Sequence, residues 1–177
     1  MNLAHVHLLL NHIPVIGTLV GLLLLIVGMV MKSEELRKVS LGMFAILALL
    51  TLPVYFTGEP AGEVVEHLPG VTEEIIEEHE EAALTALIAT LILGVISLGG
   101  LIYFRHLASL PGWLIKVSLI LSIISMGLMG WTANLGGQIR HTEIRAGFKP
   151  PTSDEKVVEE IQKESESEKE SKSEKEK

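Results

Sequence analysis

Histidine and glutamate are the residues of this chain whose side chains could bind a metal ion or carry a proton. The 177 residues include seven histidines, and carboxylates are dense between residues 58 and 81. Histidine is the commonest neutral metal ligand and titrates near pH 7. The chain has no cysteine, which excludes disulfides, thiolate metal sites, iron–sulfur clusters and covalently attached c-type haem. The available chemistry is therefore that of imidazoles and carboxylates.

One use of these residues is axial ligation of b-type haem. A haem inside a helical bundle takes one histidine from each of two helices, and His12 and His79 supply such a pair. The guanidinium groups of Arg140 and Arg145 are suited to pair with the haem propionates. The candidate cofactor-binding residues are His12, His79, His141, His7, Arg140 and Arg145.

Two other uses stay open. The first is a copper, zinc or iron site, for which the four-residue spacing of Glu63 and His67 would place both side chains on one helical face. The candidate metal ligands are His12, His79, His141, His5, His67 and Glu63. The second is a proton relay or a pH-sensing site. Against all of these stands a purely structural interpretation, in which histidines are solvated at a membrane surface; taken singly, we expect this for His5, His67 and His106.

Four hydrophobic runs predict the elements that must position these residues. The runs cover about 8–31, 39–56, 82–104 and 113–133. Each is close to or above the roughly 20 apolar residues that cross a bilayer. Backbone polar groups need internal partners in hydrocarbon, so the runs should be helices. Short connections favour an up-down-up-down bundle. We therefore predict an all-α integral membrane protein: a four-helix transmembrane domain in 1–151 with an extramembrane acidic loop, and a charged tail, disordered or helical, in 152–177.

Helix signals and basic residues predict the direction of the chain. Thr72 before two glutamates indicates a helix start, and that helix could continue to Tyr103, a length of about 48 Å. Basic residues flank the turns between the first and second runs and between the third and fourth, which makes that side cytoplasmic by the positive-inside rule. Both termini then lie outside a bacterial or archaeal inner (plasma) membrane. Residues 1–12, 58–81 and 134–177 would share the outer surface and gather six of the seven histidines there.

Small and hydroxyl-bearing residues recur at helical spacing along three of the runs. The three stripes are His7, Asn11, Pro14, Thr18, Gly21, Leu25 and Gly28; His79, Ala83, Ala86 and Thr90; and Ser118, Ser122, Ser125, Met129 and Thr132. Such stripes allow membrane helices to approach closely and to hydrogen-bond with one another. The alternative interpretation is that the small residues below His79 leave room for a flat cofactor.

Four stretches resemble a known family. They are His5-Val-His-Leu-Leu-Leu-Asn-His-Ile-Pro14, Tyr55-Phe-Thr-Gly-Glu-Pro60, the region around His79, and Asn134-Leu-Gly-Gly-Gln-Ile-Arg-His141. Over residues 3–146 the chain resembles a bacterial four-helix membrane family catalogued as domain of unknown function 2231. The resemblance implies four spans, a histidine-bearing outer surface and haem binding, with His12, His79 and His141 as the matching candidates.

Composition and motifs narrow the class of function. A net charge of −8 and few aromatic residues argue against a nucleic-acid partner. No nucleophile–base pair or phosphate-binding loop is present, so we expect no enzyme with a substrate turnover of its own. We predict a small membrane electron-transfer protein with b-type haem near the outer surface, within a respiratory or quinol-linked complex. Its expected partners are lipid, quinol, membrane or periplasmic redox subunits, and further copies of the chain. The alternatives are a non-catalytic structural subunit of a membrane complex and a copper, zinc or iron binding protein.

Overall fold

A computed structural model of the chain describes residues 3–148. The chain divides into two units, Met1–Arg140 and His141–Lys177. The tail predicted for 152–177 lies outside the described residues.

The first unit is helical throughout its described part, with no strand among residues 3–140. Its helices are α1 (Leu3–Leu10), α2 (His12–Val30), α3 (Glu34–Phe56), α4 (Gly58–Val65), α5 (Glu73–Tyr103) and α6 (Gly112–Arg140). The described part of the second unit holds one 3₁₀ turn, η1 (Thr142–Ile144). The all-α class predicted from the hydrophobic runs is confirmed for the described residues.

Four helical segments are long and apolar enough to cross a membrane, which identifies a multi-pass membrane protein by length and composition. Within the described residues these segments are Leu3–Val30, Glu34–Val65, Glu73–Tyr103 and Gly112–Arg140. The helices continue past the predicted hydrophobic runs, and α6 extends to Arg140 where the run ends near Ala133. The predicted limits of the third long helix are confirmed, because α5 begins directly after Thr72 and ends at Tyr103.

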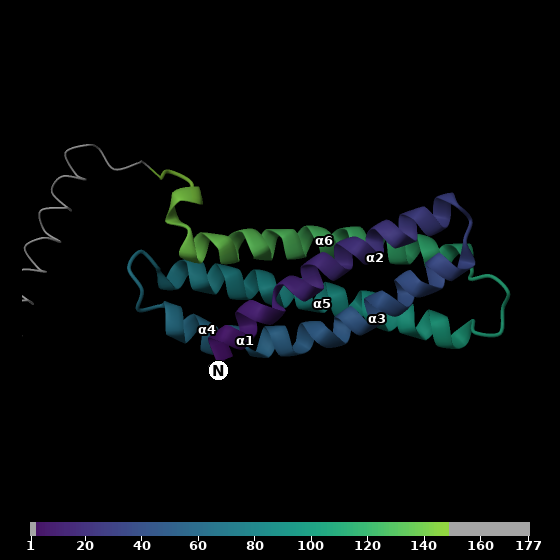
Figure 1. Ribbon diagram of the computed structural model, residues 1–177, viewed down its shortest axis with the longest axis horizontal. Helices are drawn as coiled ribbons and strands as arrows, with labels where there is room; N and C mark the ends of the chain where they lie inside the picture. Colours follow the sequence, from purple (N-terminus) through teal and green to yellow (C-terminus); the bar gives the residue numbers. More distant parts are fainter. Residues whose placement is uncertain (1–2, 149–177) are drawn as a thin grey trace, which may run out of the picture. The chain divides into compact units, whose positions relative to one another are not determined.

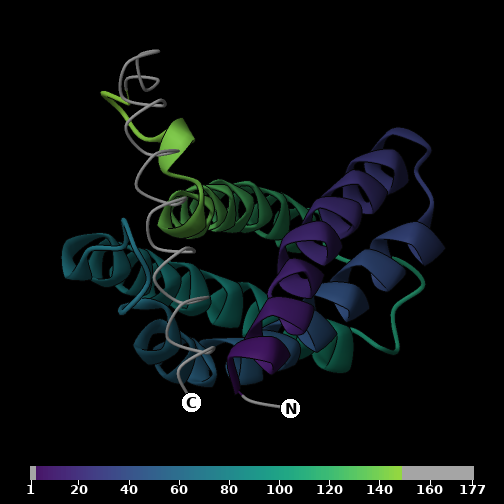
Figure 2. The ribbon, with the colours of Figure 1, turned by 60° about the vertical axis from the view of Figure 1, so that its left-hand side comes forward.

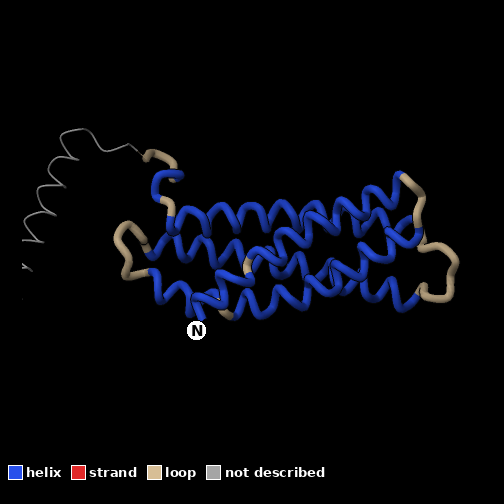
Figure 3. Tube along the Cα trace, in the orientation of Figure 1, coloured by secondary structure: helices blue, strands red, loops and turns tan. Residues whose placement is uncertain are grey.

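The four long helices lie side by side along the length of the first unit (Figures 1 and 2). Helix α5 contacts α3 and α6, and α2 likewise contacts α3 and α6. Short helices α1 and α4 contact each other at one end, where the 66–72 connection also lies, and the 104–111 connection lies at the other end (Figure 3). We call these the α1–α4 end and the far end of the bundle.

The residue stripes predicted from helical spacing face the interior. Their buried members are Pro14, Thr18, Gly21, Leu25 and Gly28 on α2, Ala86 and Thr90 on α5, and Ser118, Ser122, Ser125 and Met129 on α6. Small residues on this face permit close approach of neighbouring helices. At Gly21, for example, an added Cβ would lie 2.6 Å from Cε1 of Phe44 on α3.

The acidic segment differs from the predicted loop. Residues 58–65 form α4 and residues from 73 onward belong to α5, so only 66–72 connect them. Pro60 lies in the first turn of α4, where a proline is tolerated because its missing N–H would have no helical partner. Thr72 precedes the helix as expected, but its side chain makes no capping hydrogen bond.

The first hydrophobic run is broken at Asn11, between α1 and α2. Pro14 lies three residues further on and has no N–H to donate to the Leu10 carbonyl, which weakens the helix at this point. The helix is interrupted here by one residue.

A polar clamp joins three segments at the far end. The Glu34 carboxylate pairs with Arg37 at 2.6 Å through Oε1 and accepts a hydrogen bond from the Leu110 backbone N–H at 2.9 Å through Oε2. The Arg37 Nε–H donates to the Gly28 carbonyl at 3.1 Å. The end of α2, the start of α3 and the chain before α6 are thereby tied together.

Candidate histidine site

His7 extends from α1 toward the end of α3. Its half-buried imidazole places Nδ1 3.0 Å from the Val54 carbonyl oxygen and 3.3 Å from the Thr57 hydroxyl. Val54 lies in the last turn of α3, where carbonyl groups lack the usual helical partners. The Thr57 hydroxyl itself donates to Pro53 and Val54 carbonyls. The ring of His7 therefore contributes to capping the C-terminal end of α3.

His79 lies two turns into α5 and faces α6. Its Nδ1 is 3.0 Å from the Thr132 carbonyl oxygen, and the ring is half-buried. Gly136 lies one turn further along α6, and a Cβ added there would lie 3.0 Å from Cε1 of the same ring. An alanine at this position would press on the imidazole, which would have to shift by a few tenths of an ångström. The prediction that His79 faces the other helices is confirmed.

His7 and His79 both lie toward the α1–α4 end of the first unit, and a positive charge on one ring would disfavour a positive charge on the other. A carbonyl oxygen can only accept a hydrogen bond, so in both rings the proton resides on Nδ1. In a neutral imidazole this leaves an unprotonated lone pair on Nε2. Among the described residues neither Nε2 atom has a hydrogen-bond partner. Metal-bound histidines commonly show this arrangement, in which the second nitrogen is oriented by a main-chain carbonyl.

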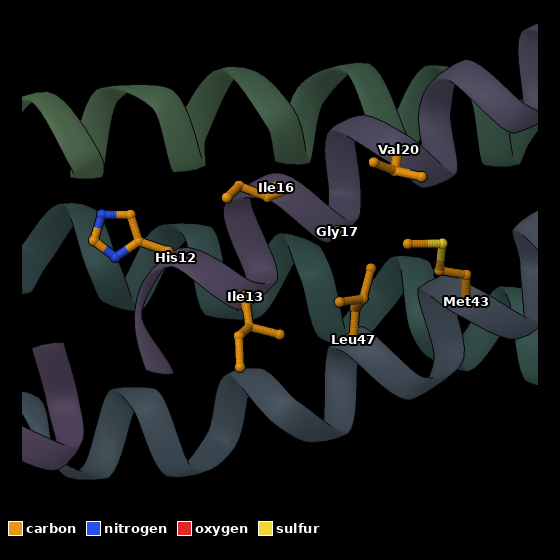
Figure 4. A pocket seen from close by; sticks show the side chains of 7 residues that line it. All are labelled: His12, Ile13, Ile16, Gly17, Val20, Met43 and Leu47. Atoms are coloured by element: carbon orange, nitrogen blue, oxygen red, sulfur yellow. The ribbon is translucent and has the colours of Figure 1, made fainter. Parts of the chain in front are cut away.

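His12 does not share this environment. It is exposed at the start of α2, at one end of an apolar groove on the α2–α3 surface (Figure 4). The groove is lined by His12, Ile13, Ile16, Gly17, Val20, Met43 and Leu47. The structure thus leaves His7 half-buried, as it does His79, where residue type and position in the hydrophobic run favoured His12. The reason is rotational: five residues separate His7 from His12, about 140° around a helix beyond one full turn. The stripe from His7 to Thr18 in the sequence already includes His7 and leaves out His12.

The metal ligands predicted between α4 and α5 are not brought together. Helix α4 ends at Val65, so Glu63 and His67 do not share a helical face, and this prediction is wrong. Both side chains are exposed, as is His5, and His67 lies 3.4 Å from the carboxylate of Glu66. Within residues 3–148, no group of three or more histidines, cysteines and acids converges in a way that could hold a metal ion.

The remaining candidates lie at the boundary of the two units. Arg140 is the exposed last residue of α6, one turn beyond Gly136. His141 and Arg145 belong to the second unit, where the His141 Nδ1–H donates to the Glu143 carboxylate at 2.9 Å. The hydrogen bond from the Glu143 backbone and the one from His141 lower the pKa of the Glu143 carboxyl.

Comparison with known proteins leaves the chain without an assigned relative. No family model matches it, and neither a curated protein nor a solved structure is significantly similar to it.

Proposed function

We propose that this protein is a small integral membrane electron carrier that binds b-type haem through the Nε2 atoms of His7 and His79. The observation that supports it is that two half-buried imidazoles, on α1 and α5 toward the same end of the bundle, each have Nδ1 hydrogen-bonded to a carbonyl of another helix. Bis-histidine haem ligation requires two neutral rings that present Nε2, and these rings have that tautomer.

The surroundings of the pair suit a flat, partly apolar group with two acidic substituents. Gly136 lies against the His79 ring and Gly58 against the His7 ring, where a Cβ would be 3.6 Å from Cε1. The two small residues allow each ring to lie close to a helix backbone. Arg140, one turn beyond Gly136 on α6, is our candidate to pair with a propionate. A bound haem would supply one-electron chemistry, and the chain would supply ligands, orientation and a low-dielectric setting.

The membrane orientation belongs to the same proposal. We infer a four-pass, up-down-up-down arrangement in a bacterial or archaeal inner membrane, with the α1–α4 end and the termini outside. Lys32, Arg37, Lys38 and Arg105 lie in or beside the far-end connections, which the positive-inside rule assigns to the cytoplasm. The electron partners would then be quinol or a redox subunit at the outer surface.

The test is a visible absorption spectrum of protein purified from haem-replete cells, beside three single variants. Wild-type protein should show a Soret band and a sharp α band on reduction. His7→Ala and His79→Ala should each abolish low-spin ligation. His12→Ala should retain it, because His12 is exposed and lies off the interior stripe.

Two outcomes would contradict the proposal. One is absence of a Soret band in every wild-type preparation. The other is a low-spin spectrum that survives His7→Ala but is lost in His12→Ala. Elemental analysis of the same samples distinguishes haem iron from a copper ion, which two neutral imidazoles also suit.

A further inference from the structure

Four hydroxyl side chains in the middle of the first unit form what we call the hydroxyl layer. It consists of Thr18 on α2, Thr90 on α5, and Ser122 and Ser125 on α6. Each of these residues is at most 1% exposed. The layer is independent of any bound cofactor, so the inference goes beyond the function proposed above.

Three of the four residues lie at one level of the bundle, and Ser122 lies about one turn from Ser125 on α6. Gly21 on α2 and Gly94 on α5 both lie against Phe44 of α3. A Cβ added at Gly21 would be 2.6 Å from the Phe44 ring, and one added at Gly94 would be 3.4 Å from the Phe44 carbonyl oxygen. Thr18 and Thr90 each lie about one turn from those glycines, toward the α1–α4 end. The His79 ring on α5 lies against Gly136 on α6, which fixes one common level of the two helices. Thr90 lies eleven residues after His79, and Ser125 lies eleven residues before Gly136. The two helices cover the same distance, because the rise per residue is the same in both.

The hydrogen bonds of the layer are incomplete. Thr90 donates to the Ala86 carbonyl at 2.8 Å and Ser122 donates to the Leu119 carbonyl at 2.9 Å, which leaves both oxygens able to accept. Thr18 Oγ1 and Ser125 Oγ are buried and have no hydrogen-bond partner among the described residues. The layer therefore contains two unused donors and two oxygens that can still accept, a set that bound water would satisfy.

We propose that the hydroxyl layer holds ordered water inside the membrane-spanning bundle. The Asn11 side-chain oxygen, seven residues before Thr18 on the same stripe, is also buried without a partner and extends the polar groups toward His7. Toward the far end the interior holds the apolar cluster that includes Leu25, Phe44 and Leu93, with the buried hydroxyls of Ser97 and Ser118 on the same side. We therefore expect water to enter from the α1–α4 end. A sodium ion is the competing occupant, but no carboxylate lies in the layer to balance its charge.

The test is X-ray radiolysis of the full chain in lipid nanodiscs, followed by mass spectrometry of methionine oxidation. Radicals formed from bound water oxidise neighbouring side chains. Met129 is 4% exposed and lies one turn from Ser125 on the same stripe, whereas Met43 lines the apolar α2–α3 groove. Met129 should be oxidised severalfold faster than Met43. The double variant Thr18→Val/Ser125→Ala should reduce the Met129 rate to that of Met43, while Thr85→Val, at an exposed position on α5, should leave it unchanged.

Equal rates for Met129 and Met43 in the wild type, or a Met129 rate unaffected by the double variant, would overturn the proposal. Ser125→Ala alone serves the same comparison if circular dichroism shows that the double variant has lost helix. A Met129 rate that rises when choline replaces sodium would identify a cation as the occupant and would also contradict it.

Discussion

The two interior histidines are oriented by main-chain carbonyls and not by carboxylates. Val54 on α3, 47 residues after His7, supplies one carbonyl, and Thr132 on α6, 53 residues after His79, supplies the other. A neutral acceptor selects the tautomer without stabilising the charged ring as an acid would. His7 and His79 are thereby suited to act as neutral ligands, which is the property that haem or a metal ion requires.

Gly136 tests how far this orientation depends on close packing. Gly136→Ala should displace the His79 ring, weaken its bond to the Thr132 carbonyl and destabilise the fold by about 1–3 kcal/mol. Gly130→Ala on the same helix is the matched control, because its Cβ would meet nothing within 4 Å. It should be neutral, or stabilising by up to about 1 kcal/mol through helix propensity. Thermal unfolding and the ¹⁵N NMR signals of His79 give the readout; identical behaviour of the two variants would refute the packing argument.

At the scale of helices, stability depends on how closely interior faces approach. Helix α5 approaches α3 closely at Gly94, where an added Cβ would collide with the side chain of Ala48. In a bilayer, lipid chains are as apolar as leucine, so helix association rests on van der Waals packing and interhelical hydrogen bonds. The exposed large apolar side chains on the outer faces, such as Leu98 and Ile124, are what a lipid-facing surface requires.

Two glycines on α5 provide a direct comparison. Gly94→Ala should force α3 and α5 apart and cost about 1–3 kcal/mol of stability. Gly99→Ala has open space around its Cβ and should not destabilise the protein. Unfolding in increasing SDS would measure both. Equal midpoints would mean that the α3–α5 contact contributes little to the fold.

For the whole molecule, aromatic residues mark both ends of the long helices. Tyr55 and Phe56 pair edge-to-face at 5.7 Å near the end of α3, while Phe104 and Trp113 pair at 6.2 Å across the 104–111 connection. Aromatic side chains are enriched where a span meets the headgroup region. The two pairs fit a bundle whose ends coincide with the two membrane surfaces.

The absence of cysteine allows the orientation to be tested with single-cysteine variants. Thr72→Cys should react with a membrane-impermeant maleimide in intact cells, because it lies in the connection proposed to face outward. Ser109→Cys should react only after permeabilisation. Both positions are exposed. The reverse pattern would invert the proposed orientation, and labelling of both from one side would contradict the four-pass arrangement.

The sequence alone determined the helices and their interior faces. Thr72 before two glutamates indicates the start of a helix, and a connection follows Tyr103, so the limits of α5 could be predicted. The stripe through Thr18, Gly21 and Leu25 follows from helical periodicity, which is a local property of the chain. Burial of small and hydroxyl residues in a membrane follows from the same periodicity.

Only the tertiary structure decided which histidines are half-buried and which carbonyl groups they contact. His7 and His12 are both near an apolar run, and their difference in burial depends on which side of the first helical segment faces the interior of the bundle. The acidic segment behaves likewise: its helix ends at Val65, which separates Glu63 from His67. Contacts between residues about fifty positions apart are set by how whole helices pack, and no local pattern in the chain encodes them.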